Sequence, residues 1–313
     1  MRVAAIDLGT ATTRLLIADV CAGVVEELER DCIITHLGEG LAATGLIHQE
    51  AVERELAVCA GYLERIAAYE CAGTQPVESI WAVATSAMRD AANSQSVLAA
   101  LRQIGLEVEI ISGKLEAELG FSGTLSGFAD TPEIDNQAVL VIDVGGGSTE
   151  LALGLHHHIM LSRSFDAGSR RITDRFLSSD PPTAGELKTA RDWLMTLMWD
   201  FFAEMPIQPQ LAIGVAGAAT SAIAVRESLE PYDREQVHRA RISAGELRNV
   251  LKDLANMNLE QRRQRVGLDP ARAPIIVGGL IVLDVVLELA DLDELTISET
   301  DTLHGMALYL SKR

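Results

Sequence analysis

Two stretches of the chain share one pattern of apolar and polar positions. The run VAAIDLG, residues 3–9, ends in Asp7 and Gly9, and the chain returns through TATTRLLIADV, residues 10–20. This arrangement predicts a β-hairpin with a polar tip. The segment VLVIDVGGGSTELALGL, Val139–Leu155, again reads as strand, aspartate, glycine turn with hydroxyls, and strand. We therefore predict an internally duplicated chain.

The segments around these hairpins alternate between helical and strand patterns. Residues 49–68 carry apolar side chains at spacings of three and four, which predicts an amphipathic helix. Further predicted elements are strands over Ser79–Met88, Val108–Ile111, Gln210–Val215 and Glu294–Ile297, and helices over Val97–Ile104, Ala184–Met205, Ile275–Ala290 and Thr302–Leu310. This alternation favours a layered α/β fold. Residues 123–136, rich in Gly, Ser, Asp and Pro, mark the best boundary between two domains.

The composition is that of a globular protein with an acidic surface. The 313 residues are 48% hydrophobic, and 26 Lys and Arg stand against 45 Asp and Glu, which gives a formal charge of −19. This charge argues against a surface that binds nucleic acid or an anionic membrane. Because charges are screened over about 8–10 Å at cellular salt, a small anion still responds mainly to its own pocket.

The sequence predicts a cytoplasmic protein that does not span a membrane. Asp7 lies where a signal peptide needs an unbroken apolar stretch, and Asp284 and Glu288 follow the most apolar run, Ile275–Leu283. The four cysteines, at positions 21, 32, 59 and 71, lack the spacing of a zinc site. We interpret them as buried thiols in a reducing compartment.

The second hairpin carries the pattern of a phosphate cradle. Glycines let backbone N–H groups approach a phosphate closely, and neighbouring hydroxyls add donors. The cradle residues are Gly145, Gly146, Gly147, Ser148 and Thr149. A tight hairpin that needs glycine only for its turn is the alternative, but three consecutive glycines exceed that need.

Carboxylates flank this cradle. Asp143 ends the preceding strand, where it is placed to bind Mg2+, and Glu150 lies close enough to assist. The first hairpin is a weaker copy, in which Asp7, Gly9 and Thr10 take the corresponding places. Two such hairpins suggest opposed phosphate loops that line one cleft between duplicated domains.

A third junction of strand and helix lies at residues 214–221, with the sequence GVAGAATS. The N-terminus of the helix that follows suits an anion or the sugar of a nucleotide. Close packing of small residues explains the same pattern equally well.

At this point the sequence resembles the exopolyphosphatase and guanosine pentaphosphate phosphohydrolase (Ppx/GppA) family, which is part of the superfamily of actin, heat-shock chaperone ATPases and sugar kinases. The segments AAIDLGT, ATSAMRDAAN, EIISGKLEAEL and VIDVGGGSTELALG match family motifs in order. The likeness covers nearly the whole chain, whose length resembles that of the short, two-domain members.

The resemblance implies two duplicated ribonuclease H-like domains with an interdomain cleft. We place them at residues 1–125 and 126–300, and a C-terminal helix over 301–313 is a candidate addition to the first. It also implies an enzyme of the stringent response that removes the terminal phosphate of polyphosphate or guanosine pentaphosphate with Mg2+. Glu116 matches the general base that activates water, and Arg89 matches an arginine that clamps phosphate.

Several positions depart from the family pattern, namely Ala11, Leu115, Glu118 and His304. They keep two alternatives open: a superfamily kinase that uses ATP, and a non-catalytic sensor that binds an alarmone or polyphosphate. The preference between polyphosphate and guanosine pentaphosphate also stays open, because both present the same terminal phosphoanhydride. The helix over Ile275–Ala290 is apolar on two faces, which suits either a homodimer contact or the core.

Overall fold

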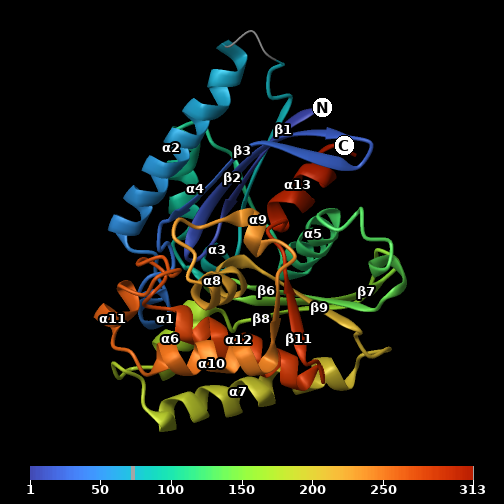
Figure 1. Ribbon diagram of the computed structural model, residues 1–313. Helices are drawn as coiled ribbons and strands as arrows, with labels where there is room; N and C mark the ends of the chain where they lie inside the picture. Colours follow the sequence, from blue (N-terminus) through green and yellow to red (C-terminus); the bar gives the residue numbers. More distant parts are fainter. Residues whose placement is uncertain (72–74, 313) are drawn as a thin grey trace. The chain divides into compact units, whose positions relative to one another are not determined.

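The computed structural model describes residues 1–71 and 75–312, and the chain forms two compact units (Figure 1). Unit 1 comprises Met1–Ser126 and Thr302–Arg313, and unit 2 comprises Gly127–Asp301. Both units are α/β, as the sequence predicts.

Unit 1 is built on a five-stranded mixed sheet of order β3-β2-β1-β4-β5. Strands β1, β2 and β3 form an antiparallel meander, and β4 and β5 extend it in parallel with β1. The strands are β1 Arg2–Leu8, β2 Thr12–Cys21, β3 Val24–Ile34, β4 Ser79–Ala84 and β5 Val108–Ile110. The helices are α1 Leu41–Thr44, α2 Gln49–Cys71, α3 Ser86–Asp90, α4 Ser94–Gln103, α5 Gly113–Ser126 and α13 Thr302–Leu310.

The period-two pattern of β1 and β2 divides the core of unit 1 into two layers. Ile6 and Ile17 pack in the cluster that contains side chains of α2 and α4, whereas Ala5 and Leu16 pack in the cluster that contains side chains of α5 and α13. Successive strand residues point to opposite faces, so one hydrophobic run serves both layers. Figure 1 shows α2 and α4 along one face of this sheet and α13 beside α5 on the other.

Unit 2 repeats this order in a six-stranded sheet, β10-β11-β9-β6-β7-β8. Strands β6, β7 and β8 form the meander, β9 and β11 run parallel to β6, and β10 adds an antiparallel edge. The strands are β6 Val139–Val144, β7 Thr149–Leu155, β8 His158–Phe165, β9 Leu211–Val215, β10 Arg241–Ser243 and β11 Glu294–Ile297. Each unit is therefore ribonuclease H-like, and the predicted duplication is confirmed.

Helices complete unit 2 and bury the most apolar segment of the chain. They are η1 Ile134–Asn136, α6 Ser169–Phe176, α7 Ala184–Ala203, α8 Ala216–Glu227, α9 Arg234–Val237, α10 Ala244–Ala255, α11 Leu259–Arg263 and α12 Ile276–Leu289. Helix α12 packs against α6, α7, α8 and α10, and its residues 276–287 are all buried. Its two apolar faces are thus covered within unit 2, so this pattern gives no support to a dimer contact.

Two local predictions were wrong. The strand predicted over Ser79–Met88 ends at Ala84, and residues 86–90 form α3, because the apolar run does not distinguish a strand from the helix that continues it. Cys59 is buried, but Cys21 and Cys32 are exposed. Cys21 ends β2 and Cys32 lies on the edge strand β3, where apolar neighbours in sequence do not ensure burial. The Cys71 side chain lies outside the described residues.

Among residues 1–71 and 75–312, no helix combines the length and apolar character that crossing a membrane requires.

Candidate functional site

The two glycine turns have the same architecture. In each, a glycine N–H donates back across the turn: Gly9 to the Thr12 carbonyl at 2.9 Å, and Gly145 to the Ser148 carbonyl at 3.0 Å. The strand registers agree as well, because Leu8 pairs with Thr13 and Val144 pairs with Thr149. We call residues 9–12 the first loop and residues 145–148 the second loop.

The carbonyl groups of the second loop are bound from one side by the start of α6. Ser169 N donates to Gly145 O at 2.8 Å, Arg170 N to Gly146 O at 2.9 Å, and Gly168 N to Gly147 O at 3.1 Å. In a trans peptide the N–H of the next residue points opposite to the carbonyl. The N–H groups of residues 146, 147 and 148 therefore point away from α6, as an anion-binding nest requires.

Gly168 makes this packing sterically feasible, and the sequence pattern did not single it out. A Cβ atom there would lie 2.5 Å from Gly146 C and 2.6 Å from both Gly146 O and Gly147 N. Backbone atoms cannot rotate away as a side chain does, so only glycine allows α6 to approach the second loop this closely.

The first loop is held by the segment that follows β3. Thr10 O accepts from Gly38 N at 2.9 Å, and Ala11 O accepts from Thr35 N at 3.1 Å and from His36 N at 3.0 Å. The Thr10 hydroxyl and Asp7 Oδ1 are buried and have no hydrogen-bond partner. Buried polar atoms are nearly always satisfied in folded proteins, so these two fit a ligand that the first loop would receive.

One position distinguishes the charge of the two hairpins. In the first, Asp7 pairs across the strands with Arg14, which forms an ion pair with its carboxylate. In the second, Asp143 pairs with Glu150, and the two carboxylate side chains are only 7% and 4% exposed. Directly opposite residues project from the same face of a sheet, so two acids lie side by side in unit 2, whereas an aspartate has an arginine opposite it in unit 1.

This pair of carboxylates fits a hard cation. Ser164 Oγ donates to Glu150 Oε1 at 2.6 Å and so orients one of the two groups. Mg2+ is commonly held by one or two carboxylates together with water and substrate phosphates. Among the described residues, no group of three or more His, Cys, Asp or Glu side chains is placed to hold a metal. Asp143 and Glu150 would therefore need water or substrate oxygens to complete the coordination.

Glu116 and Arg89 meet in unit 1. Glu116 lies in the first turn of α5 and is buried, and its Oε2 accepts from Arg89 Nη1 at 2.8 Å. Arg89 Nη1 also donates to Ile111 O at 3.0 Å. The predicted general base and the predicted phosphate clamp are thus ion-paired.

The sheet of unit 1 explains why these groups gather. Strands β1, β4 and β5 are parallel, and their last residues Leu8, Ala84 and Ile110 stand in register. The first loop, α3 and α5 each begin beyond that edge. In open parallel sheets, ligands bind outside the carboxyl ends of the strands.

The Thr149 hydroxyl and the third junction, both candidate anion-binding groups, make contacts within unit 2. Thr149 is fully buried, and its hydroxyl donates to Ala167 O at 2.8 Å. At the start of α8, a Cβ on Gly217 would lie 2.8 Å from Arg272 Nη1, so an arginine of the same unit covers this position. Close packing thus accounts for the small residues at 214–221. Phosphate binding by Thr149 stays a prediction.

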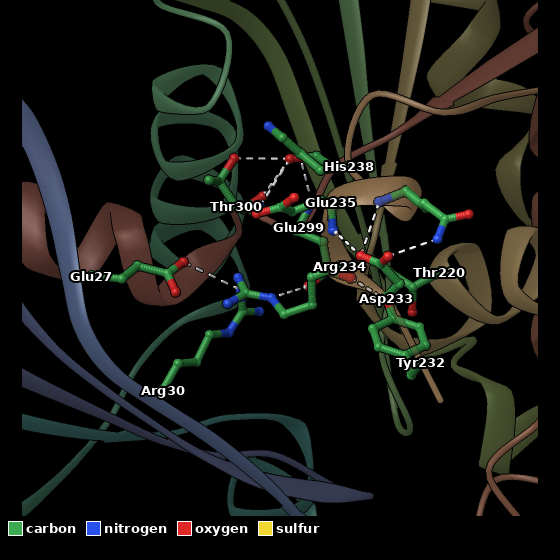
Figure 2. A network of polar contacts seen from close by, with 12 residues as sticks. Glu27, Arg30, Thr220, Tyr232, Asp233, Arg234, Glu235, His238, Glu299 and Thr300 are labelled. Carbon is green, nitrogen blue, oxygen red and sulfur yellow. Dashed lines mark hydrogen bonds and ion pairs between the residues drawn. The ribbon is translucent and has the colours of Figure 1, made fainter. Parts of the chain in front are cut away.

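A polar network lies beyond β11 and includes Tyr232, Arg234, His238 and Glu299 (Figure 2). Glu299 accepts from the Tyr232 hydroxyl and from Arg234 Nε at 3.0 Å, and its N–H donates to His238 Nδ1 at 3.2 Å. Burial raises the pKa of Tyr232 and lowers the pKa of His238. Both shifts favour the neutral forms of Tyr232 and His238.

Comparisons with known proteins agree on one family. A model of the Ppx/GppA phosphatase family matches residues 16–313. Exopolyphosphatase 2 of Mycobacterium tuberculosis is 36% identical over 99% of this chain and 98% of its own. The crystal structure of an exopolyphosphatase-like protein is 30% identical with a TM-score of 0.91, and covers 99% of this chain and 97% of its own. A Ppx/GppA protein of Aquifex aeolicus is 27% identical with a TM-score of 0.81, over 100% and 98%.

Proposed function

The chain belongs to the Ppx/GppA phosphatase family, and from this premise we propose that it removes the terminal phosphoryl group of inorganic polyphosphate, guanosine pentaphosphate or both. The observation that carries the proposal is the second loop, where three peptide N–H groups point away from α6 next to a buried pair of carboxylates. An anion nest beside a cation site suits a phosphoryl group with its bound metal.

Glu116 is the proposed general base. It would take a proton from the water molecule that attacks the terminal phosphorus, while the new P–O bond forms and the phosphoanhydride bond breaks. The bridging oxygen leaves with the electron pair as the new end of the shortened substrate. Glu116 then returns its proton to solvent. A positioned base contributes about 100- to 10,000-fold to the rate.

The other groups would stabilise charge. Asp143 and Glu150 are the residues that would hold Mg2+, which when bound neutralises charge on phosphoryl oxygens. Arg89 is ion-paired with Glu116, which supports a role in which it holds the base and contributes positive charge near the phosphate. The N–H groups of the second loop would bind phosphoryl oxygens.

A substrate panel tests this function. Purified protein is offered polyphosphate of several lengths, guanosine pentaphosphate and ATP in parallel, with and without Mg2+, and orthophosphate is measured. We expect Mg2+-dependent release from at least one of the first two without any acceptor. ADP formed only with a phosphate acceptor would identify a kinase instead, and tight binding without turnover at saturating Mg2+ would identify a sensor.

A further inference from the structure

A carboxyl group that the proposed mechanism does not use lies buried beside the first loop. Glu55, on α2, is 0% exposed, and Val52 and Cys59, one turn before and after it on the same helix, belong to the apolar core of unit 1. Its Oε1 accepts from Thr13 Oγ1 at 2.6 Å, but its Oε2 is buried and has no hydrogen-bond partner. A carboxylate with one unsatisfied buried oxygen is costly, so this site favours the neutral acid.

The groups that face Glu55 do not reverse this preference. Thr13 and Thr35 offer hydroxyls, and the Cys59 thiol lies 3.7 Å from Oε1. Burial raises the pKa of Glu55, the Asp7 charge raises it further, and the hydroxyl hydrogen bonds lower it.

The neighbouring cations and phenol are engaged elsewhere. Arg14 forms an ion pair with Asp7, and Arg54 Nε donates to Thr35 O at 2.9 Å. The Tyr62 hydroxyl donates to Thr13 O at 3.0 Å, and burial raises its pKa. Glu55 is thus not paired with either of these arginines.

Short polar contacts connect Glu55 to the first loop. Thr13 directly follows the loop, and its hydroxyl lies 3.2 Å from that of Thr35. The N–H of Thr35 donates to Ala11 O at 3.1 Å. The orientation of the peptide between Ala11 and Thr12 is thereby coupled to Glu55, and the N–H of this peptide points opposite to the bound carbonyl.

The second loop lacks such a group. Thr149 occupies the position that corresponds to Thr13, and its hydroxyl donates to the backbone carbonyl of Ala167. A carbonyl does not titrate, whereas a carboxyl group does. The duplicated loops therefore differ at this position: the first is held through the acidic side chain of Glu55, and the second through a backbone carbonyl.

We propose that Glu55 is a positioning residue that holds the first loop for phosphate binding through Thr13 and Thr35. It acts as a neutral acid, and its ionisation as the pH rises places a negative charge behind the loop and weakens phosphate binding. This inference rests on the proposed function, because it assumes that the first loop receives phosphate.

Two variants separate positioning from a merely structural role. Glu55→Gln keeps an acceptor for Thr13 but cannot ionise, and Glu53→Gln on the exposed face of α2 is the matched control. We expect KM for polyphosphate to rise about three- to tenfold with increasing pH in the wild type and in E53Q, but to stay flat in E55Q. Thr13→Val removes the hydrogen bond that connects Glu55 to the first loop and that lowers the pKa of Glu55, so it should raise KM at every pH and move any remaining rise to higher pH.

An independent readout keeps this test separate from the enzymatic proposal. Infrared difference spectra of wild type against E55Q should show the band of a protonated carboxylic acid below the pH at which KM rises, and calorimetric titration with tripolyphosphate should give the same pH dependence in Kd as in KM. Three results would each overturn the inference: the same rise in KM with pH in E55Q as in the wild type, the absence of that infrared band, or no binding of tripolyphosphate at any pH. A protein that binds tripolyphosphate as expected but hydrolyses no substrate would instead refute the proposed function alone.

Discussion

The two duplicated hairpins differ in charge at one equivalent position. Arg14 and Glu150 occupy equivalent places opposite Asp7 and Asp143. Arg14 forms an ion pair with Asp7, whereas the residue opposite Asp143 is a second acid, Glu150. Mg2+ is commonly held by one or two carboxylates, so we propose that the metal binds at the carboxylate pair of unit 2.

This assignment predicts a metal response that depends on both carboxylates of unit 2. Mg2+ should raise the Tm of the wild type because it binds only the folded state, and Asp143→Asn or Glu150→Gln should abolish that rise. Either change should also slow phosphate release by about 100-fold or more, since loss of even outer groups around a metal costs about 10- to 100-fold.

The matched control for this experiment is Asp135→Asn, which alters an exposed carboxylate of unit 2 that pairs with His157. It should keep the Mg2+-dependent rise in Tm, as measured by calorimetry. A full Mg2+-dependent rise in Tm in both D143N and E150Q would show that Asp143 and Glu150 do not hold the metal.

Residue patterns revealed the chemistry that is local in sequence. The run of three glycines and the aspartate before it identified the second loop, and the structure places its N–H groups on one side. Glu55 left a fainter signal, because it lies three residues after Val52 and four before Cys59 on the apolar face of α2. A carboxyl group at such a position indicates a buried partner, which Thr13 supplies.

At the scale of elements, the second loop depends on a contact that no local pattern announces. Gly168 approaches residues 146 and 147 from about 20 residues further along the chain, and α6 binds three loop carbonyls. Sequence spacing predicts hairpins and amphipathic helices, because these depend on near neighbours. It does not predict which helix start meets which loop.

We predict that Gly168→Ala displaces the second loop. The added methyl group would meet backbone atoms at 2.5–2.6 Å, so the loop or α6 must move. The free energy of unfolding should fall by about 1–3 kcal/mol, and KM for polyphosphate should rise, as urea titration and initial rates will report.

Gly185→Ala provides the control. Gly185 lies in the first turn of α7, and the nearest atom to an added Cβ is Thr183 Oγ1 at 4.0 Å. Alanine is preferred in a helix by up to about 1 kcal/mol, so G185A should unfold at the same or a higher urea concentration. Equal losses in both variants would show that G168A acts through general helix effects and not through the loop.

At the scale of the whole molecule, duplication supplies two loops of the same architecture from one folding pattern. Repeated hairpin sequences predicted the two α/β units, and the strand orders confirm them. The apolar helix over residues 275–290 is the exception, since its pattern fitted both an interface and a core. The contacts of this helix with α6, α7, α8 and α10 show that it belongs to the core. The periodicity of a sequence does not reveal which elements contact one another.

The acidic character of the molecule is compatible with an anionic substrate because binding is local. The formal charge is −19, yet the second loop directs N–H groups to one side, and Arg89 lies beside Glu116. Charges beyond about 8 Å are largely screened at physiological salt, so these groups outweigh the distant carboxylates.

The most direct measurement compares Glu116→Gln with Glu118→Gln, an exposed carboxylate one half-turn along the same helix. Phosphate release from polyphosphate under saturating Mg2+ should fall by about 100- to 10,000-fold in E116Q and stay near the wild-type rate in E118Q, while both variants bind tripolyphosphate and melt as the wild type does. An E116Q variant that releases phosphate at the wild-type rate would contradict the assignment of Glu116 as the base.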